Sequence, residues 1–301
     1  MTATTPPSLD DTKCPLPSSP PLAPPSQPDA PLGEPGARPG EPDARPWLPP
    51  PLRGMRAAFV FFTRIPVSGF PYRSADFRWA GAHAPFVGLV LGGVLGALDV
   101  LLLPVGALAA AILVLGASLL FTGAFHEDGL ADTSDALGGG YDVAKVLAIL
   151  KDSRIGSFGG AALVISIIGR AALLASLGRD ALYALPLAFC GARVGPIWLM
   201  ATMRYVTSDE TSRSRQLTQG GPVQAVVATA WLVAAIIACI AANLISWPRA
   251  LALATALLVV TILTGWRYKS RVGGITGDFL GATEQLGELV ALGALAWKAA
   301  T

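Results

Sequence analysis

The feature that most constrains the fold is a succession of long apolar runs. A run of about 20 apolar residues in helical conformation reaches across the hydrocarbon of a bilayer. Six such runs, and a weaker seventh that contains Glu284 and Glu288, lie at residues 84–103, 106–125, 155–177, 181–203, 223–245, 250–266 and 280–297. Hydrophobic residues make up 52% of the chain and charged residues 14%, which is unusual for a soluble domain. The sequence therefore predicts an all-α, polytopic integral membrane helical bundle with about six to seven transmembrane helices.

The first 52 residues differ from the rest in composition. They hold 17 of the 25 prolines, and such a segment cannot bury enough apolar surface to offset its ordering entropy. We expect residues 1–52 to form a disordered cytoplasmic tail and residues 53–301 to form the membrane-embedded domain. Residues 53–78 are amphipathic, and their apolar part is too short to span a bilayer. This pattern predicts an interfacial helix followed by a loop.

Basic residues are distributed unevenly between the connections. If the tail is cytoplasmic, the connections on its side carry nine: Lys145, Lys151, Arg154, Arg204, Arg213, Arg215, Arg267, Lys269 and Arg271. The opposite connections hold only Arg179 and Arg249. Because cytoplasmic connections carry an excess of Lys and Arg, this difference predicts the orientation of the chain. It also places every polar, motif-like stretch on the same face of the membrane.

The stretch HEDGLADTSD, residues 126–135, concentrates acidic residues directly after an apolar run. If it is helical, Asp128, Asp132 and Asp135 fall at positions i, i+4 and i+7 and point to one side. Three carboxylates on one stripe repel one another unless a cation lies between them, and such oxygen ligands suit Mg²⁺ or Mn²⁺. The alternative is an acidic, solvated loop. The pattern favours a metal site for phosphate chemistry.

Two further stretches on the same predicted face carry polar residues. KDSRIGSFGG spans residues 151–160, and GGITGDFLGA spans residues 273–282. Lysine and arginine bind phosphate oxygens, and glycines let backbone amides approach them closely. His126 has the side chain that most readily acts as a general base near neutral pH, although an inert interfacial histidine is an equal alternative. Together these residue types indicate metal-assisted phosphoryl or nucleotidyl transfer.

Glycines and charged residues inside the predicted spans also carry information. Three glycines recur at four-residue spacing in the first span: Gly88, Gly92 and Gly96. This spacing predicts a close helix contact. Asp99, Arg170 and Arg193 lie within or at the edge of spans, where a charge is usually paired or functional. Asp99 and Arg170 are equally explained as interfacial residues, whereas Arg193 is more deeply placed and is a candidate for the site.

Several classes of site lose support. No HExxH, GxSxG, Walker A or GxGxxG motif occurs, which disfavours zinc proteases, serine hydrolases and common nucleotide-binding folds. No basic block interleaved with aromatic residues suggests nucleic-acid binding. Cys14, Cys190 and Cys239 are far apart and form neither a disulfide framework nor a metal knuckle.

The chain resembles the cobalamin synthase family, the adenosylcobinamide-GDP ribazoletransferases. The resemblance covers about residues 55–298 and rests on FFTRIPV, APFVGLVLG, FHEDGLADTSDA, KDSRIGSFG and GGITGDFLGA. It implies a Mg²⁺-dependent enzyme of the bacterial cytoplasmic (inner) membrane, with its active site facing the cytoplasm. The reaction joins adenosylcobinamide-GDP to α-ribazole, or to α-ribazole 5′-phosphate, and releases GMP. Glu127 is a departure, because an apolar or variable residue is expected there.

The reaction that the resemblance implies gives roles to the polar stretches. Asp128, Asp132 and Asp135 are expected to hold Mg²⁺. The residues expected to take part in catalysis are His126, Asp128, Asp132, Lys151 and Arg154. The residues expected to bind substrate are Asp152, Gly156, Arg193, Arg271, Gly274, Thr276, Gly277 and Asp278. Asp152 and Asp278 are also candidates for metal or ribose contacts.

Two other functional classes share some of these sequence features. A CDP-alcohol phosphotransferase shares the chemistry, but its motif requires Arg where this chain has Asp132. A transporter usually places its polar groups near the bilayer midplane, in repeated halves. Here the motifs share one face and no repeat is evident, which disfavours transport. Membrane lipid is an expected partner, and a homo-oligomer or a complex with other cobalamin assembly enzymes is left open.

Overall fold

The computed structural model describes residues 2, 49–67, 74–206 and 221–297, and these ranges are almost entirely helical. Within them the chain forms α-helices and short 3-10 turns, and an isolated parallel bridge joins Tyr205 to Ile275. The predicted all-α fold is confirmed. Most of the predicted tail, together with Arg213 and Arg215, lies outside the described residues.

The helices follow the predicted apolar runs closely. Their bounds are α1 (Pro50–Phe62), α2 (Ser74–Ala80), α3 (Ala84–Leu102), α4 (Ala107–Thr122), α5 (Phe125–Gly139), α6 (Val143–Ile149), α7 (Ser157–Leu177), α8 (Ala181–Ala192), α9 (Val194–Thr202), α11 (Pro222–Ala241), α12 (Trp247–Val272) and α13 (Gly277–Ala296). Prolines at the first helical turns suit these starts, because proline has no N–H to leave unpaired.

Fewer helices than the six to seven predicted are long and apolar enough to cross a membrane. Four stretches of the described chain are long and apolar enough to cross a membrane: Asp76–Val105, Ser157–Thr202, Pro222–Ala241 and Trp247–Val272. A fifth is added only if α4 and α5, which meet at 93°, count as one span. The chain is thus a polytopic membrane protein by these criteria, and the predicted count of six to seven is not confirmed.

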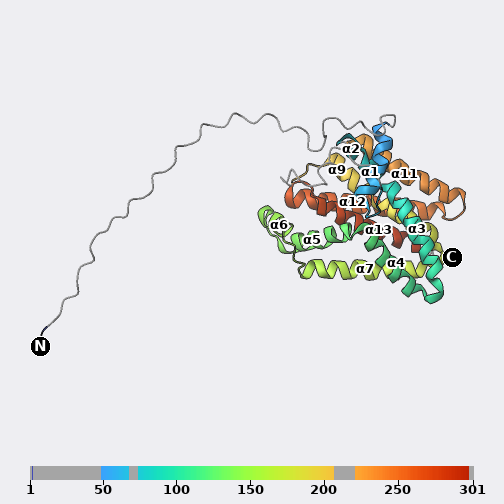
Figure 1. Ribbon diagram of the computed structural model, residues 1–301, viewed down its shortest axis with the longest axis horizontal. Coiled ribbons are helices and arrows are strands. Elements are labelled where there is room, and N and C mark those ends of the chain that lie inside the picture. The colour runs from blue at the N-terminus through green and yellow to red at the C-terminus, as the bar shows by residue number, and fades with distance from the viewer. Residues whose placement is uncertain (1, 3–48, 68–73, 207–220, 298–301) are drawn as a thin grey trace. The chain divides into compact units, whose positions relative to one another are not determined.

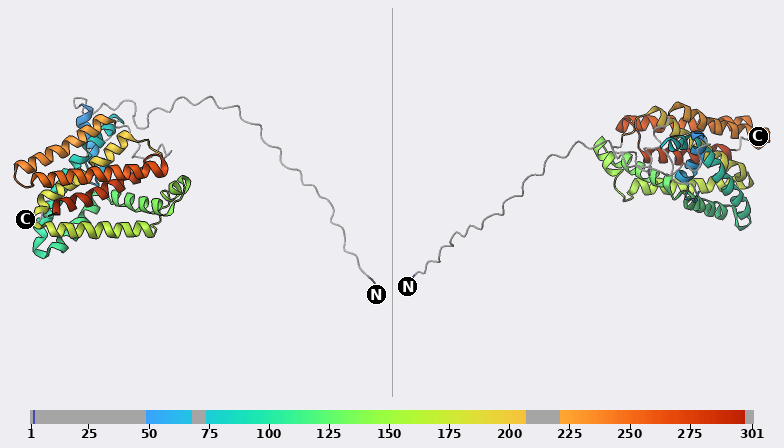
Figure 2. Two further views of the ribbon diagram at one scale, coloured as in Figure 1. Left: turned by 180° about the vertical axis from the view of Figure 1, so that it is seen from behind. Right: turned by 45° about the horizontal axis from the view of Figure 1, so that its top comes forward.

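Helix α13 lies in the middle of the bundle. In Figures 1 and 2 it runs between α12 on one side and α5 with α7 on the other, and it packs against all three. Helices α3 and α8 pack on one another through the glycines at four-residue spacing. A Cβ on Gly88 would lie 2.4 Å from the Phe189 carbonyl oxygen, and one on Gly92 would lie 2.6 Å from that of Leu185. The predicted close contact is therefore confirmed.

The position of α5 depends on glycines at its start and at its crossing with α13. Gly123 and Ala124 adopt left-handed backbone conformations, with φ of 73° and 57°, and so turn the chain sharply between α4 and α5. At the crossing, a Cβ on Gly129 would lie 2.8 Å from the Asp278 carbonyl oxygen and 3.1 Å from the Gly281 Cα atom. Only glycine allows this approach, which brings the acidic part of α5 to the start of α13.

Candidate functional site

The acidic stretch forms a helix, as the spacing of its carboxylates predicts. Asp128 on α5 is exposed, and Asp132 one turn later is half-buried. Neither side chain forms an ion pair or hydrogen bond with a residue that the structure describes. Two adjacent carboxylates without a cationic partner repel one another. They are therefore available to a cation from solution.

The start of α13 adds a third carboxylate to this side of the site. The Thr276 hydroxyl accepts a hydrogen bond from the Phe279 backbone N–H at 3.3 Å, so Thr276 caps α13 and Asp278 lies in its first turn. Asp128, Asp278 and Asp135 each add repulsion to a charge on Asp132. We call Asp128, Asp132 and Asp278 the carboxylate surface.

The environment of Asp278 differs from that of an ordinary surface carboxyl. Burial raises its pKa, a hydrogen bond to the backbone opposes this rise in part, and the nearby negative charge of Asp128 raises the pKa further. Burial and the charge of Asp128 both disfavour the charged form of Asp278. A carboxyl whose pKa is moved toward neutrality is better suited to accept a proton than one of ordinary pKa.

Asp135 has a different environment from the other two carboxylates of its stripe. One carboxylate oxygen accepts from the Gly156 backbone N–H at 2.6 Å, and the other accepts from the Gly159 N–H at 2.8 Å. These amides belong to the N-terminus of α7, where backbone donors lack partners within the helix. Asp135 therefore holds the first turn of α7 against α5. Its expected role as a metal ligand stays a prediction.

The donor set suits a metal site that substrate completes. Among the described residues, no group of three His, Cys, Asp or Glu side chains is arranged to hold a metal ion. Mg²⁺ is commonly bound by one or two carboxylates together with substrate phosphates and water. Asp128 and Asp132 supply two unpaired carboxylates of this kind. The residues present therefore fit Mg²⁺ held jointly with a phosphate-bearing substrate.

The predicted phosphate-binding cations lie in the connection after α6 and at the end of α12. Lys151 and Arg154 are exposed in the connection between α6 and α7. Arg154 forms an ion pair with Asp152 at 2.6 Å, and its hydrogen bonds to Asp152 lower the pKa of that carboxyl to about 2. Arg271, at the end of α12, donates a hydrogen bond to the Gly140 carbonyl just after α5. Arg271 is thus fastened to the end of α5, whereas Arg154 is held within its own connection.

The glycines predicted to contact phosphate pack against protein backbone or cap a helix. A Cβ on Gly274 would lie 2.4 Å from the Arg204 carbonyl oxygen, where Ile275 N–H donates to the same carbonyl at 2.9 Å. Gly277 is the first residue of α13, directly after its cap Thr276. Gly156 donates to Asp135, as described above. Their predicted substrate contacts stay untested, and their backbone roles are the ones that the structure describes.

A buried ionic network joins four helices beneath the carboxylate surface, and the sequence did not predict it. Arg170 on α7 lies 2.8 Å from Glu288 and 3.3 Å from Glu127. Arg193, between α8 and α9, lies 2.9 Å from Glu284 and 3.4 Å from Glu288. Every one of these side chains is at most 8% exposed. These pairs are the principal charged contacts that link α5 and α7 to α13.

His126 belongs to this ionic network and not to the carboxylate surface. Its Nδ1 atom lies 3.4 Å from Glu284 Oε2, and its ring stacks on Phe62. The side chain is 5% exposed, whereas Asp128 two residues later is exposed. Arg193, expected to bind substrate, also donates to the Phe189 carbonyl at 2.6 Å. Both residues are therefore enclosed by protein in this structure.

One signal in the sequence could have revealed the ionic network. Glu284 and Glu288 are four residues apart and so share a face of a helix in an apolar run, and Arg170 and Arg193 lie in two other apolar runs. Charges in such runs are usually paired. Glu127, which departs from the expected apolar residue, supplies the third carboxylate. Asp99 is also buried in α3, but its Oδ1 atom has no hydrogen-bond partner among the described residues.

This chain is similar to known proteins of one family that carry one name. The family model described as cobalamin-5-phosphate synthase matches residues 54–296. A protein of Shewanella piezotolerans named adenosylcobinamide-GDP ribazoletransferase is 40% identical over 240 residues, covering 77% of this chain and 90% of that protein. Proteins of the same name from Leptothrix cholodnii and Polaromonas sp. are 38% and 37% identical, covering 80% and 77% of this chain and 93% and 92% of their own length. No solved structure matches this chain.

Proposed function

The chain belongs to the cobalamin-5-phosphate synthase family, and from this membership we infer that it is an adenosylcobinamide-GDP ribazoletransferase. It transfers the phosphate-linked adenosylcobinamide of adenosylcobinamide-GDP to a hydroxyl of α-ribazole, or of α-ribazole 5′-phosphate, and GMP is released. The observation that carries the assignment of the site is the unpaired carboxylate surface of α5 and the start of α13. The connection that carries Lys151 and Arg154 is joined to the same helix through the hydrogen bond from Gly156 to Asp135.

Asp128 and Asp132 are the proposed ligands of Mg²⁺. They are unpaired, they lie one turn apart on α5, and they leave positions for phosphate oxygens of the substrate. Mg²⁺, when bound, neutralises the diphosphate and stabilises charge on the departing GMP. Asp135 supports these two residues by fixing α7 to α5, and its hydrogen bonds to Gly156 and Gly159 are the reason for this assignment.

Lys151 and Arg154 are the proposed phosphate-binding residues. Both are exposed in the connection that Asp135 fastens to α5 through Gly156. The guanidinium of Arg154 is oriented by Asp152, and a planar guanidinium can bind two phosphate oxygens at once. We place the GMP phosphate between these cations and the carboxylate surface.

Asp278 is the proposed proton acceptor. An oxygen of the acceptor hydroxyl attacks the phosphorus next to cobinamide, the bond from that phosphorus to the GMP oxygen breaks, and the hydroxyl proton passes to a base. Asp278 lies beside Asp128 and has a raised pKa, which suits a general base. His126 is enclosed against Glu284, so we assign its side chain to the ionic network instead.

The proposed site faces the cytoplasm of a bacterial inner membrane. The support is the excess of basic residues in the connections on one side, including Lys145 and Lys151 before α7 and Lys269 near the end of α12. Adenosylcobinamide-GDP is a nucleotide derivative, and nucleotides are made in the cytoplasm. Whether the protein acts as a homo-oligomer or with other assembly enzymes stays a prediction.

One assay tests the function. Purified full-length protein is incubated with adenosylcobinamide-GDP, α-ribazole and Mg²⁺, and cobalamin and GMP are quantified. The expected result is the formation of both products in equal amounts, abolished by EDTA and restored by Mg²⁺. Release of GMP without α-ribazole would indicate a hydrolase, and release of CMP from a CDP-alcohol would indicate the related phosphotransferase chemistry.

A further inference from the structure

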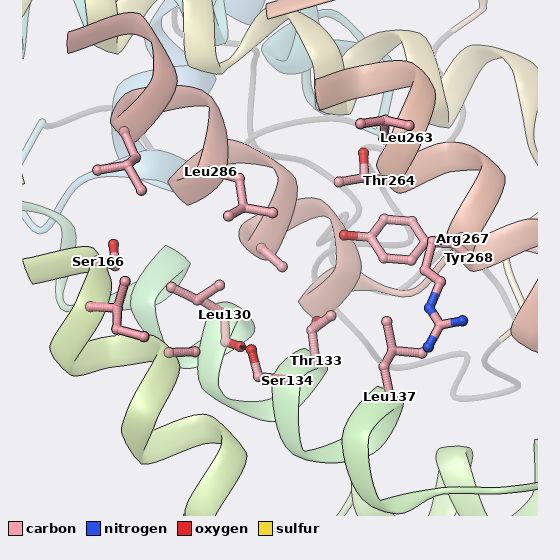
Figure 3. A pocket seen from close by; sticks show the side chains of 14 residues that line it. Leu130, Thr133, Ser134, Leu137, Ser166, Leu263, Thr264, Arg267, Tyr268 and Leu286 are labelled. Carbon is pink, nitrogen blue, oxygen red and sulfur yellow. Dashed lines mark hydrogen bonds between the residues drawn. The ribbon is translucent and has the colours of Figure 1, made fainter. Parts of the chain in front are cut away.

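A groove between four helices lies apart from the carboxylate surface. Its volume is about 410 Å³, within the range of small-molecule sites. Figure 3 shows the side chains that line it, which come from α5, α7, α12 and α13. Leu130 and Leu137 of α5 contribute to it, and these residues lie on the opposite face of α5 from Asp128 and Asp132.

Most of the groove wall is apolar, and several of its hydroxyls are already bonded. Ser134 donates to the Leu130 carbonyl at 2.7 Å, and Thr264 donates to the Val260 carbonyl at 2.8 Å. The Tyr268 hydroxyl is 3.1 Å from that of Thr283. These groups therefore present their carbon atoms to the groove. The wall as a whole suits a hydrocarbon.

Thr133 is the exception in the part of the groove near Arg267. Its side chain is buried, at 5% exposed, and its Oγ1 atom has no hydrogen-bond partner among the described residues. A buried hydroxyl without a partner costs free energy. A ligand that carries a hydrogen-bonding atom, such as an ester oxygen, would satisfy it. Ser166, also buried and unpartnered, lies at the other end of the groove (Figure 3).

The groove opens between two helices that are candidates to cross the membrane. Its most exposed lining residues are Ile165 on α7, at 66%, and Leu263 on α12, at 56%. Both continue into exposed apolar faces of their helices, which include Ile168 and Ile262. Surfaces of this kind are in contact with lipid in a bilayer. A ligand of the groove therefore enters from the hydrocarbon.

One end of the groove is basic. Arg267 lines it, and no described residue forms an ion pair with the Arg267 guanidinium. Lys269 and Arg271 follow in the last turn of α12. Figure 3 shows the Arg267 side chain reaching the groove at the end where Leu137 lies, and Thr133 belongs to the same helix as Leu137, one turn earlier. A ligand with an anion at Arg267 would share the groove with the unpartnered hydroxyl of Thr133.

We propose that this groove binds a single glycerophospholipid with an anionic headgroup. Its phosphate contacts Arg267, an ester oxygen accepts a hydrogen bond from Thr133, and one acyl chain lies along α13 from Ala282 to Leu289, a length of about 10 Å. The lipid would fill the space between α7 and α12 beneath α5. This inference does not depend on the catalytic assignment.

Photolabelling tests the proposal. The full-length protein is reconstituted in phosphatidylcholine vesicles with a small share of phosphatidylglycerol that carries a diazirine in one acyl chain. After illumination, labelled peptides are mapped by mass spectrometry. We expect labels to concentrate at residues 130–137, 162–166 and 263–267. Equal labelling of the exposed outer face of α11, for example at Val233 and Ile237, would overturn the proposal.

Two pairs of variants sharpen this test. Ala162→Phe fills the groove and is expected to remove the concentrated labels, whereas Ala161→Phe, on the neighbouring exposed residue, is expected to keep them. Arg267→Gln is expected to lower labelling by phosphatidylglycerol about fivefold, and Lys269→Gln by much less, because only Arg267 lines the groove. Unchanged labelling in both Ala162→Phe and Arg267→Gln would also overturn the proposal. The wild-type map decides the question even if a variant fails to fold.

Discussion

Helix α5 carries acidic residues on two faces, and the two faces have opposite environments. Glu127 is buried and pairs with Arg170, and His126 beside it faces Glu284. Asp128 and Asp132 are exposed or half-buried and pair with no described cation. The carboxylate of the buried face is paired with a cation of the protein, although its Oε2 atom has no hydrogen-bond partner among the described residues, whereas the other face leaves its carboxylates to a ligand.

This difference separates stability from chemistry within one helix. A buried charge that loses its partner is strongly destabilising, so the ionic network is expected to fix α5 in place. Unpaired surface carboxylates repel one another and add little to folding. Their presence at a helix crossing that only glycine permits is better explained by ligand binding. We therefore propose that the buried face positions the helix and that the exposed face takes part in the chemistry.

The largest expected effect is on the buried face. Arg170→Met leaves Glu127 and Glu288 without their shared cation and is expected to lower the free energy of unfolding by about 3–5 kcal/mol. Unfolding in mixed detergent micelles, followed by circular dichroism, measures it. The double variant Arg170→Met with Glu288→Met removes charges of both signs and should recover part of the loss. An unchanged unfolding free energy in Arg170→Met would show that the ionic network does not hold α5.

The next effect concerns the exposed face. Asp128→Asn and Asp132→Asn are each expected to lower Mg²⁺-dependent GMP release by about 100-fold or more while the unfolding free energy changes by less than about 0.5 kcal/mol. Steady-state kinetics over a range of Mg²⁺ concentrations measures the loss. If either variant kept full activity, that residue would not be a metal ligand. If activity fell only in proportion to the loss of folded protein, the exposed face would contribute to stability, as the buried face does, and not to metal binding.

Asp135 shares the acidic stripe of Asp128 and Asp132, but its side chain accepts hydrogen bonds from the protein backbone. Its replacement tests whether it stabilises the fold or binds the metal. Asp135→Ala removes the acceptor of the Gly156 and Gly159 amides and is expected to cost about 1–2 kcal/mol of stability. Asp135→Asn keeps one acceptor oxygen and should cost less. A large loss of Mg²⁺ affinity with unchanged stability would instead return Asp135 to the metal site.

The smallest expected effect is on the pH profile. Because burial raises the pKa of Asp278, its base form is present above that raised pKa and is lost as the pH falls through it. GMP release should therefore decline on the acid side at a higher pH than an ordinary carboxyl would give. Asp278→Asn should lower kcat and flatten this limb while leaving the activating concentration of Mg²⁺ nearly unchanged. An acid limb that persisted in Asp278→Asn would assign the base to another group.

The sequence predicted the local features of this molecule well. The apolar runs predicted the helices of the described chain, and the glycines of α3 predicted its contact with α8. The spacing of Asp128 and Asp132 predicted that they share one face of α5. Each depends on residues close together in the chain. Helical periodicity alone therefore sufficed for them.

Features that depend on tertiary contacts were not predicted. The hydrogen bonds of Asp135 depend on where α7 begins relative to α5, and the pairing of Arg170 depends on the meeting of α5, α7 and α13. The helix period places Asp135 with Asp128, but tertiary contacts give the two residues different partners. The predicted count of spans is not confirmed, because α4 is 16 residues long and meets α5 at 93°.

The most direct test of whether the exposed face of α5 binds the metal is to measure metal binding in a variant of each face. Mn²⁺ is titrated into the wild-type protein with adenosylcobinamide-GDP and followed by electron paramagnetic resonance, in parallel with Asp128→Asn and Glu127→Gln. We predict that Asp128→Asn weakens Mn²⁺ binding about tenfold or more, and that Glu127→Gln, which keeps a hydrogen-bonding group for Arg170, leaves it nearly unchanged. Equal weakening in both variants, or none in Asp128→Asn, would contradict the assignment of metal binding to the exposed face.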